Sequence, residues 1–152
     1  MVVTEKGIAD PNLVPMPDPA NPVLLYDGVC GLCNRLVQFV LRRDSRARFR
    51  FASLQSDYAI RILQRHGLDP QDLDTLYVVA GEQLATRSDA VIFILRELGG
   101  FWRFLSFALR ILPKPLRDWG YGAIARHRYR IFGKYQSCPL PERTYQDRFL
   151  DA

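Results

Sequence analysis

A short apolar run leads directly into an acidic residue, a glycine turn and a pair of cysteines in a Cys-x-x-Cys arrangement. The run is Val23–Tyr26, the acid is Asp27, and the cysteines are Cys30 and Cys33. After the pair, apolar residues continue at helical spacing at Leu36, Val37, Val40 and Leu41. The first turn of a helix has unpaired N–H groups and a partial positive charge, which favour a cysteine thiolate. This order of strand, turn, cysteines and helix therefore predicts a redox dithiol.

The remaining patterns predict an α/β domain built around this stretch. They indicate helices over 31–43, 56–66 and 89–98, strands over 46–54, 76–79 and 83–86, and two further helices over 101–112 and 116–132. Ser56 and Ser88 are the expected N-caps of the second and third helices. The resulting β-α-β-α-β-β-α order, followed by additional C-terminal helices, is typical of a thioredoxin-like sheet with the dithiol after its first strand.

Length and cysteine content favour one intracellular domain. The 152 residues suffice for a single core. Residues 1–22 contain five prolines and are expected to form an extended arm, residues 23–140 the domain with its helical extension over about 101–132, and residues 141–152 a polar tail. Three cysteines are too few for a disulfide scaffold, and the N-terminus lacks the apolar stretch of a secretory signal, so we expect a cytoplasmic protein.

The positive charge is concentrated in one block. Residues 100–135 contain eight Lys and Arg against one acid, Asp118. Such a block can meet nucleic acid, anionic lipid or an acidic partner, but a solvated helical face is the more ordinary interpretation. We therefore expect no nucleic-acid partner, and contact with a membrane surface through 101–135 is the weaker alternative. Four aromatic residues at the start of this block are expected in the core: Phe101, Trp102, Phe104 and Phe107.

The segment Asp27–Cys33 resembles the Asp-x-x-Cys-x-x-Cys signature of the DCC family of thiol–disulfide oxidoreductases. The flanking residues agree with it: Phe51–Gln55, Ser88–Ala90, Arg130–Gly133 and Cys138. The resemblance spans most of the domain and implies a thioredoxin-like fold with a redox dithiol. In one respect the sequence departs from the wider thioredoxin pattern: Asp74–Leu76 contains no proline where those proteins place one before the third strand.

The predicted chemistry is thiol–disulfide exchange with a protein or small-molecule thiol or disulfide. Cys30, expected nearer the surface, attacks as the thiolate, and Cys33 resolves the mixed disulfide. Asp27 either relays a proton to Cys33 or fixes the turn by accepting backbone N–H bonds. Gly31 is expected to keep the approach to Cys30 open. Further candidate substrate contacts are Leu32, Thr75, Leu76, Ser88 and Asp89.

Two alternatives remain open at this stage. Cys138 is a possible accessory thiol, and with Cys30, Cys33 and either His66 or His127 it could complete a zinc site. The second Cys-x-x-Cys or paired-histidine motif that usually accompanies such a site is absent, so we expect no metal. The other alternative is a binding module that docks through its basic helices, with the dithiol as a redox switch. No phosphate-binding glycine loop is present, so no organic cofactor is expected.

Overall fold

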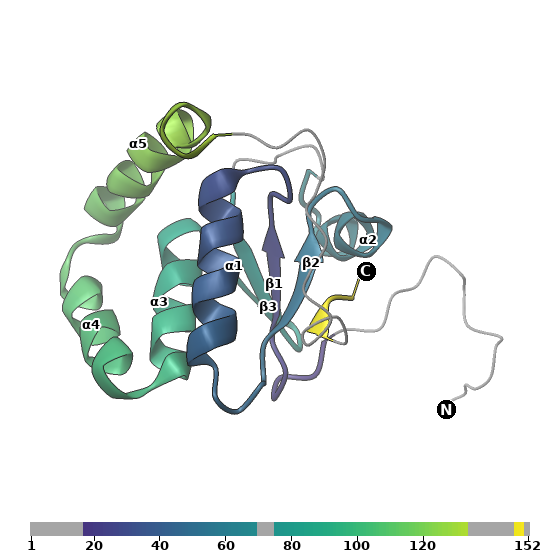
Figure 1. The fold of residues 1–152 in the computed structure, drawn as a ribbon, viewed down its shortest axis with the longest axis horizontal. Helices are drawn as coiled ribbons and strands as arrows, with labels where there is room; N and C mark the ends of the chain where they lie inside the picture. The colour runs from purple at the N-terminus through teal and green to yellow at the C-terminus, as the bar shows by residue number, and fades with distance from the viewer. Residues whose placement is uncertain (1–16, 70–74, 134–147, 151–152) are drawn as a thin grey trace, which may run out of the picture.

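The computed structural model describes residues 17–69, 75–133 and 148–150. Its elements follow the predicted order (Figure 1). They are β1 (Val23–Tyr26), α1 (Gly31–Arg43), β2 (Arg50–Ser53), α2 (Asp57–Arg65), β3 (Tyr77–Ala80), β4 (Gln83–Thr86), α3 (Arg87–Leu98), α4 (Gly100–Ile111) and α5 (Lys114–Phe132). The mixed α/β fold with a thioredoxin-like core and C-terminal helices is confirmed.

The four strands form one sheet in the order β2-β1-β3-β4. β1 runs parallel to β2 and antiparallel to β3, and β3 and β4 form the predicted hairpin. Alternate residues of β1 face opposite sides of the sheet. Leu24 and Tyr26 belong to the core under α1 and α3, whereas Val23 and Leu25 belong to the core under α2. Helices therefore cover both faces, and β1 delivers the dithiol from the centre of the sheet (Figure 1).

Two local predictions at element ends need correction. β2 starts at Arg50, later than predicted, because the chain turns through Ala47 at φ 52° and the Asp44 carboxylate accepts the Phe49 N–H at 2.8 Å. α3 starts at Arg87, so Ser88 already lies inside the helix and is not its cap. The Ser88 hydroxyl donates to the Asp118 carboxylate of α5 instead. The predicted cap at Ser56 is confirmed, since its hydroxyl accepts the Ala59 N–H.

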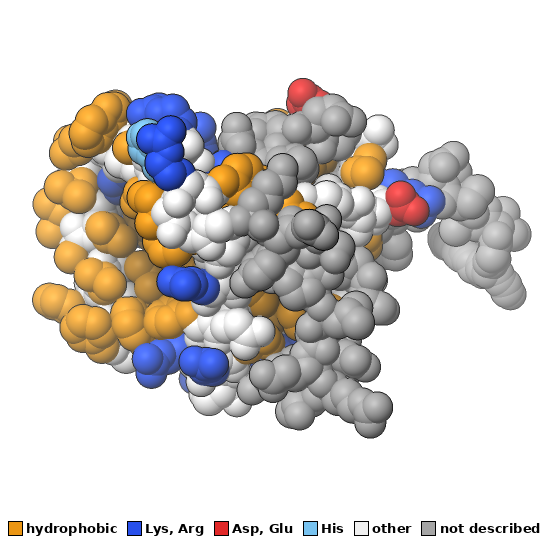
Figure 2. Space-filling view, turned by 45° about the horizontal axis from the view of Figure 1, so that its top comes forward, with side chains coloured by type: hydrophobic (Ala, Val, Ile, Leu, Met, Phe, Trp, Pro, Cys, Tyr) orange, Lys and Arg blue, Asp and Glu red, His pale blue; other side chains and the backbone are white. Residues whose placement is uncertain are grey.

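α4 has the opposite orientation to the one its sequence suggested. Ser106 is fully buried, and its hydroxyl is satisfied by the Arg103 carbonyl. Three aromatic residues assigned to the core are instead exposed, with exposed fractions of 67% for Phe101, 69% for Phe104 and 54% for Phe107. Figure 2 shows apolar side chains gathered where α4 and α5 form one edge of the molecule. Trp102 is only half-buried, edge-on to Phe39 of α1.

Segments near both chain ends contact the sheet. The Pro17 carbonyl accepts the N–H of Gly81 at the hairpin turn, and the Pro22 carbonyl accepts the Arg50 N–H, each at 2.8 Å. Near the other end, Phe149 is buried and bridges to Phe51 of β2. Phe149 is thus part of the core and not of a polar tail. Most of the predicted arm, residues 1–16, lies outside the described residues. In the described ranges, no helix is long and apolar enough to cross a membrane.

Candidate redox dithiol site

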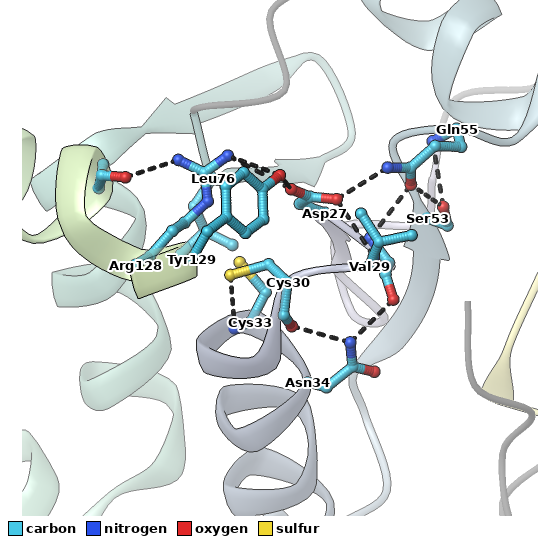
Figure 3. A network of polar contacts seen from close by, with 12 residues as sticks. Asp27, Val29, Cys30, Cys33, Asn34, Ser53, Gln55, Leu76, Arg128 and Tyr129 are labelled. Carbon is cyan, nitrogen blue, oxygen red and sulfur yellow. Dashed lines mark hydrogen bonds and ion pairs between the residues drawn. The ribbon is translucent and has the colours of Figure 1, made fainter. Parts of the chain in front are cut away.

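Cys30 is the N-cap of α1, and Cys33 lies in the helix's first turn. Both are free thiols, and the Cys33 N–H points at the Cys30 sulfur with a nitrogen–sulfur distance of 3.4 Å. The Asn34 side-chain amide donates to the Gly28 and Cys30 carbonyls at 2.9 Å each and so fixes the turn (Figure 3). The predicted placement of the dithiol after β1, at a helix N-terminus, is confirmed.

The two thiols differ strongly in acidity. A hydrogen bond from the Cys33 thiol lowers the pKa of Cys30 to about 6, against the opposing effect of burial. The backbone N–H groups of Cys33 and Leu32 and the charge of Arg128 lower the same pKa further. The hydrogen bond to Cys30 and burial raise the pKa of Cys33 well above its usual value. Near neutral pH the pair therefore holds one thiolate, on Cys30, and one thiol, on Cys33.

The exposure of the two cysteine residues is the reverse of that predicted. Cys30 has an exposed fraction of 0%, whereas Cys33 is only partly buried. The C-terminal end of α5 lies against the first turn of α1, and the Gly31 N–H donates to the Gly133 carbonyl at 3.1 Å. A Cβ at Gly31 would stand 2.1 Å from the Phe132 carbonyl oxygen. Gly31 thus permits this close contact, and does not keep the approach to Cys30 open.

Asp27 is buried at the centre of a polar network that links three elements (Figure 3). One carboxylate oxygen accepts the Val29 N–H at 3.2 Å and the Gln55 side-chain amide at 2.7 Å. The other accepts the Tyr129 hydroxyl and the Arg128 guanidinium, the latter at 3.3 Å. The network ties the turn after β1 to the end of β2 and to α5.

These partners keep Asp27 ionised despite its burial. Burial alone would raise the pKa of Asp27, but the hydrogen bonds from Tyr129, Gln55, Val29 and Arg128 together lower it below its usual value. Burial and the bond to this carboxylate raise the pKa of Tyr129 to about 12. The bond to Val29 is the turn-fixing contact considered from the sequence. A carboxyl held this firmly as the anion is a weak proton carrier at neutral pH.

An apolar cavity of about 240 Å³ opens beside Cys33. Its lining residues come from the turn after β1, from α1, α3 and α5, and from the loop before β3: Asp27, Leu32, Cys33, Leu36, Thr75, Leu76, Val91, Tyr121, Ile124, Ala125 and Arg128. Three predicted substrate contacts, Leu32, Thr75 and Leu76, are thus brought together next to the dithiol. Cys30 is not part of the lining.

Ser88 and Asp89, the other two candidate contacts, lie elsewhere. Ser88 bonds to Asp118, and Asp89 pairs with Lys114 at 2.9 Å and with Arg117 at 3.1 Å. Hydrogen bonds from Lys114 and Arg117 lower the pKa of Asp89, with the bond from Lys114 contributing most. Both residues therefore hold the start of α5 against α3, and neither lines the cavity.

The zinc hypothesis has no support among the described residues. Within them, no three His, Cys, Asp or Glu side chains come close enough together to hold a metal ion. His66 follows the last residue of α2, and His127 is exposed on α5. Cys138, the possible accessory thiol, lies outside the described residues. The roles considered for Cys138 therefore stay predictions.

Comparison with known proteins identifies the family. The sequence profile of the DCC1-like thiol-disulfide oxidoreductases matches residues 24–134. The chain belongs to this family. It is 42% identical over 130 residues to the uncharacterized protein YuxK of Bacillus subtilis, covering 86% of this chain and 94% of that protein. It is 36% identical over 119 residues to a chloroplastic DCC family protein of Arabidopsis thaliana, covering 78% of this chain and 69% of that protein. No solved structure matches.

In this DCC1-like protein, the contribution of α5 to the site was not among the features predicted from the sequence. Arg128 was assigned to a solvated basic face, yet it is buried against Asp27. The sequence does contain a signal for a shared helix face. Helical i, i+3, i+4 and i+7 spacing relates Tyr121, Ile124, Ala125 and Arg128. That spacing marks one face of α5, and this face lines the cavity.

Proposed function

We propose that this protein is an enzyme that catalyses thiol–disulfide exchange through Cys30 and Cys33. The main support is the contrast between the two sulfurs: Cys30, with a pKa of about 6, accepts hydrogen bonds at the start of α1 from the less acidic Cys33. A thiolate is both the reactive form of cysteine and a good leaving group from a disulfide. Membership of the DCC1-like family agrees with this chemistry.

The reaction moves two electrons between sulfur atoms. The reduced dithiol converts a substrate disulfide into two thiols and becomes the Cys30–Cys33 disulfide, with a mixed disulfide between the two states; the reverse reaction oxidises two substrate thiols. The proposal therefore needs no organic cofactor and no metal. The substrate is a thiol or disulfide, and a cytoplasmic location stays a prediction.

Asp27 acts in this proposal as a positioning residue. Its ion pair with Arg128 holds the guanidinium near the dithiol, where the positive charge lowers the pKa of Cys30. Its lowered pKa disfavours the alternative role as proton relay. Arg128 and Tyr129 join the proposed site for the same reason, since both bond to the Asp27 carboxylate.

A redox titration tests the function. The protein is equilibrated in glutathione buffers of graded potential and alkylated, and its free thiols are counted by mass spectrometry, with Cys138→Ser measured in parallel. We expect reversible two-electron pairing of Cys30 with Cys33 at a potential between about −120 and −300 mV. Two thiols that never pair across this range would contradict the proposal. Cys30→Ser is the control that removes the dithiol.

The exposed face of α4 and α5 favours a second candidate function, binding to an anionic lipid surface. Exposed apolar side chains lie there close in sequence to Arg103, Arg110 and Lys114, a combination typical of helices that bind membrane surfaces. Co-sedimentation with anionic vesicles tests this function. We expect the wild type to bind such vesicles and the double variant Phe104→Ser/Phe107→Ser to lose this binding. Glu82→Gln, a change at the hairpin turn away from α4 and α5, is the control and should keep it. No binding of the wild type to anionic vesicles would exclude this candidate.

A further inference from the structure

We propose that Cys33 is the sulfur that bonds to the substrate, and that the cavity beside it receives a large apolar group carried next to the substrate thiol. This inference rests on the proposed exchange function. It reverses the order of action expected from the sequence, in which Cys30 meets the substrate first.

The position of the two sulfurs relative to the cavity supports this order. Cys33 is in the cavity wall, whereas Cys30 is outside the lining and has an exposed fraction of 0%. Exchange at sulfur is an in-line displacement, so the incoming sulfur and the leaving sulfur lie on opposite sides of the one attacked. A substrate in the cavity is placed for attack on Cys33, with Cys30 as the leaving group.

The steps balance for oxidation of two substrate thiols. A substrate thiolate attacks the sulfur of Cys33 in the Cys30–Cys33 disulfide; a substrate–Cys33 bond forms, and the Cys30–Cys33 bond breaks with its electron pair on Cys30. A second substrate thiolate then attacks the first substrate sulfur. A substrate disulfide forms, and Cys33 leaves with the electron pair and takes a proton. The low pKa of Cys30 favours the first step, because a stabilised thiolate leaves faster.

The walls of the cavity indicate the chemistry of its occupant. Leu36 of α1, Val91 of α3 and Ile124 of α5 supply apolar surface. The polar groups at its edge already have partners: Asp27 pairs with Arg128, and the Tyr121 oxygen accepts the Leu76 N–H at 2.8 Å. A charged substrate group would lose its water here and gain no free partner among these groups. The cavity therefore selects an apolar group.

The size of the cavity limits that group to about one large side chain. A cavity of about 150 Å³ is sufficient to hold benzene, and this one measures about 240 Å³. A phenylalanine or leucine side chain next to a cysteine has a suitable size and polarity, and so does a short acyl chain on a small thiol. Glutathione, which carries charges next to its cysteine, does not match it.

The first experiment identifies the sulfur that is attacked. Oxidised full-length protein is mixed with N-acetyl-Phe-Cys amide, quenched in acid within the first turnover, alkylated with maleimide and mapped by mass spectrometry. We expect the dipeptide on Cys33 and the maleimide on Cys30. The opposite distribution, with the dipeptide on Cys30 and Cys33 free, would overturn the inference.

The second experiment tests the cavity. We expect N-acetyl-Phe-Cys amide to reduce the oxidised protein about tenfold faster than N-acetyl-Glu-Cys amide. Ala125→Leu, which fills the cavity, should abolish that difference, whereas Ala123→Leu on the same helix and outside the lining should preserve it. Equal rates for the two dipeptides in the wild type would overturn the apolar specificity. The same rate is measured with N-octanoylcysteamine. If this thiol reduces the oxidised protein faster than the Phe dipeptide, the apolar group comes from an acyl thiol. If it reacts more slowly, the group comes from a peptide.

The outcomes separate this inference from the function beneath it. If the wild type pairs its cysteines reversibly in glutathione buffers but shows no apolar preference or forms the adduct on Cys30, the inference alone fails. If the cysteines do not pair in any buffer, the exchange function fails as well. Far-ultraviolet circular dichroism of Ala125→Leu and Ala123→Leu confirms that both variants are folded.

Discussion

The carboxylate of Asp27 and the guanidinium of Arg128 form a buried ion pair at 3.3 Å, although the two residues are 101 positions apart in the sequence. Asp27 follows β1, one of the two central strands, and Arg128 lies near the end of α5. The pair thus joins the C-terminal helix to the turn that carries the dithiol. Its removal should affect both the stability of the fold and the acidity of Cys30.

The stability effect is tested with Arg128→Met. Removing one partner of a buried pair leaves an uncompensated charge on the other, so we expect the free energy of unfolding to fall by about 3 kcal/mol. Urea denaturation of the reduced protein measures this change. Arg126→Met is the matched control, because Arg126 is exposed on the same helix; we expect its effect to stay within about 0.5 kcal/mol. Equal losses in the two variants would show that the pair has no special role.

The acidity of Cys30 gives a second prediction. The ultraviolet absorbance of the thiolate should rise with a midpoint at about pH 6 in the reduced wild type and should be missing from Cys30→Ser near that pH. In Arg128→Met the midpoint should move to higher pH, because the charge that helps to lower the pKa of Cys30 is gone. A wild-type midpoint near the ordinary value of 9.0 would contradict the stabilised thiolate.

The lowered pKa of Cys30 also predicts how the free energy of unfolding depends on pH. The pKa of Cys30 is lower in the folded reduced protein than in the unfolded chain, so the unfolded chain binds more protons between these values. The contribution of Cys30 to stability is therefore complete above about pH 9 and is lost as the pH falls through about 6. Urea denaturation of reduced wild type and Cys30→Ser at several pH values measures it: the difference between them should grow as the pH rises from 6 toward 9.

Gly31 gives a fourth prediction, about the cover over Cys30. An alanine Cβ would stand 2.1 Å from the Phe132 carbonyl oxygen, so Gly31→Ala must push the end of α5 away from α1. We expect a loss of more than about 1 kcal/mol in stability and faster alkylation of Cys30 by iodoacetamide. Gly120→Ala is the control: its Cβ meets nothing within 4 Å, so it should stabilise α5 by up to about 1 kcal/mol and leave alkylation unchanged. Unchanged alkylation in Gly31→Ala would mean that α5 does not cover Cys30.

The features that the sequence predicted well depend on residues near one another in the chain. Strand β1, the dithiol at the start of α1, the Ser56 cap and the hairpin turn at Gly81 all follow from local spacing and turn chemistry. These signals act within one element or between adjacent ones, so they survive when the rest of the fold is unknown.

The features that were missed depend on contacts between distant residues. Helical spacing puts Arg128 on one face of α5 with Tyr121, but a charged residue in a basic block gives no local sign that its partner lies 101 positions earlier, so its pairing with Asp27 could not be predicted. Helical spacing shows that α4 has an apolar side but does not say which side the domain covers; here the side with Ser106 is covered and Phe104 is left exposed. Burial of Cys30 beneath the end of α5 likewise depends on tertiary packing.

The segment at residues 148–150 provides a final prediction, because the sequence assigned it to a polar tail. Phe149 is buried, and its ring stacks on Phe51 with 5.1 Å between ring centroids. Arg148 beside it donates to the Phe49 carbonyl at 3.1 Å, which anchors the segment along β2. Phe149→Ala should therefore lower the free energy of unfolding by about 3 kcal/mol, as for a core phenylalanine. Leu150→Ala is the neighbouring control: Leu150 is exposed, so its change should cost less than about 1 kcal/mol. Urea denaturation of both variants decides the matter, since a true tail would make the two changes equally small.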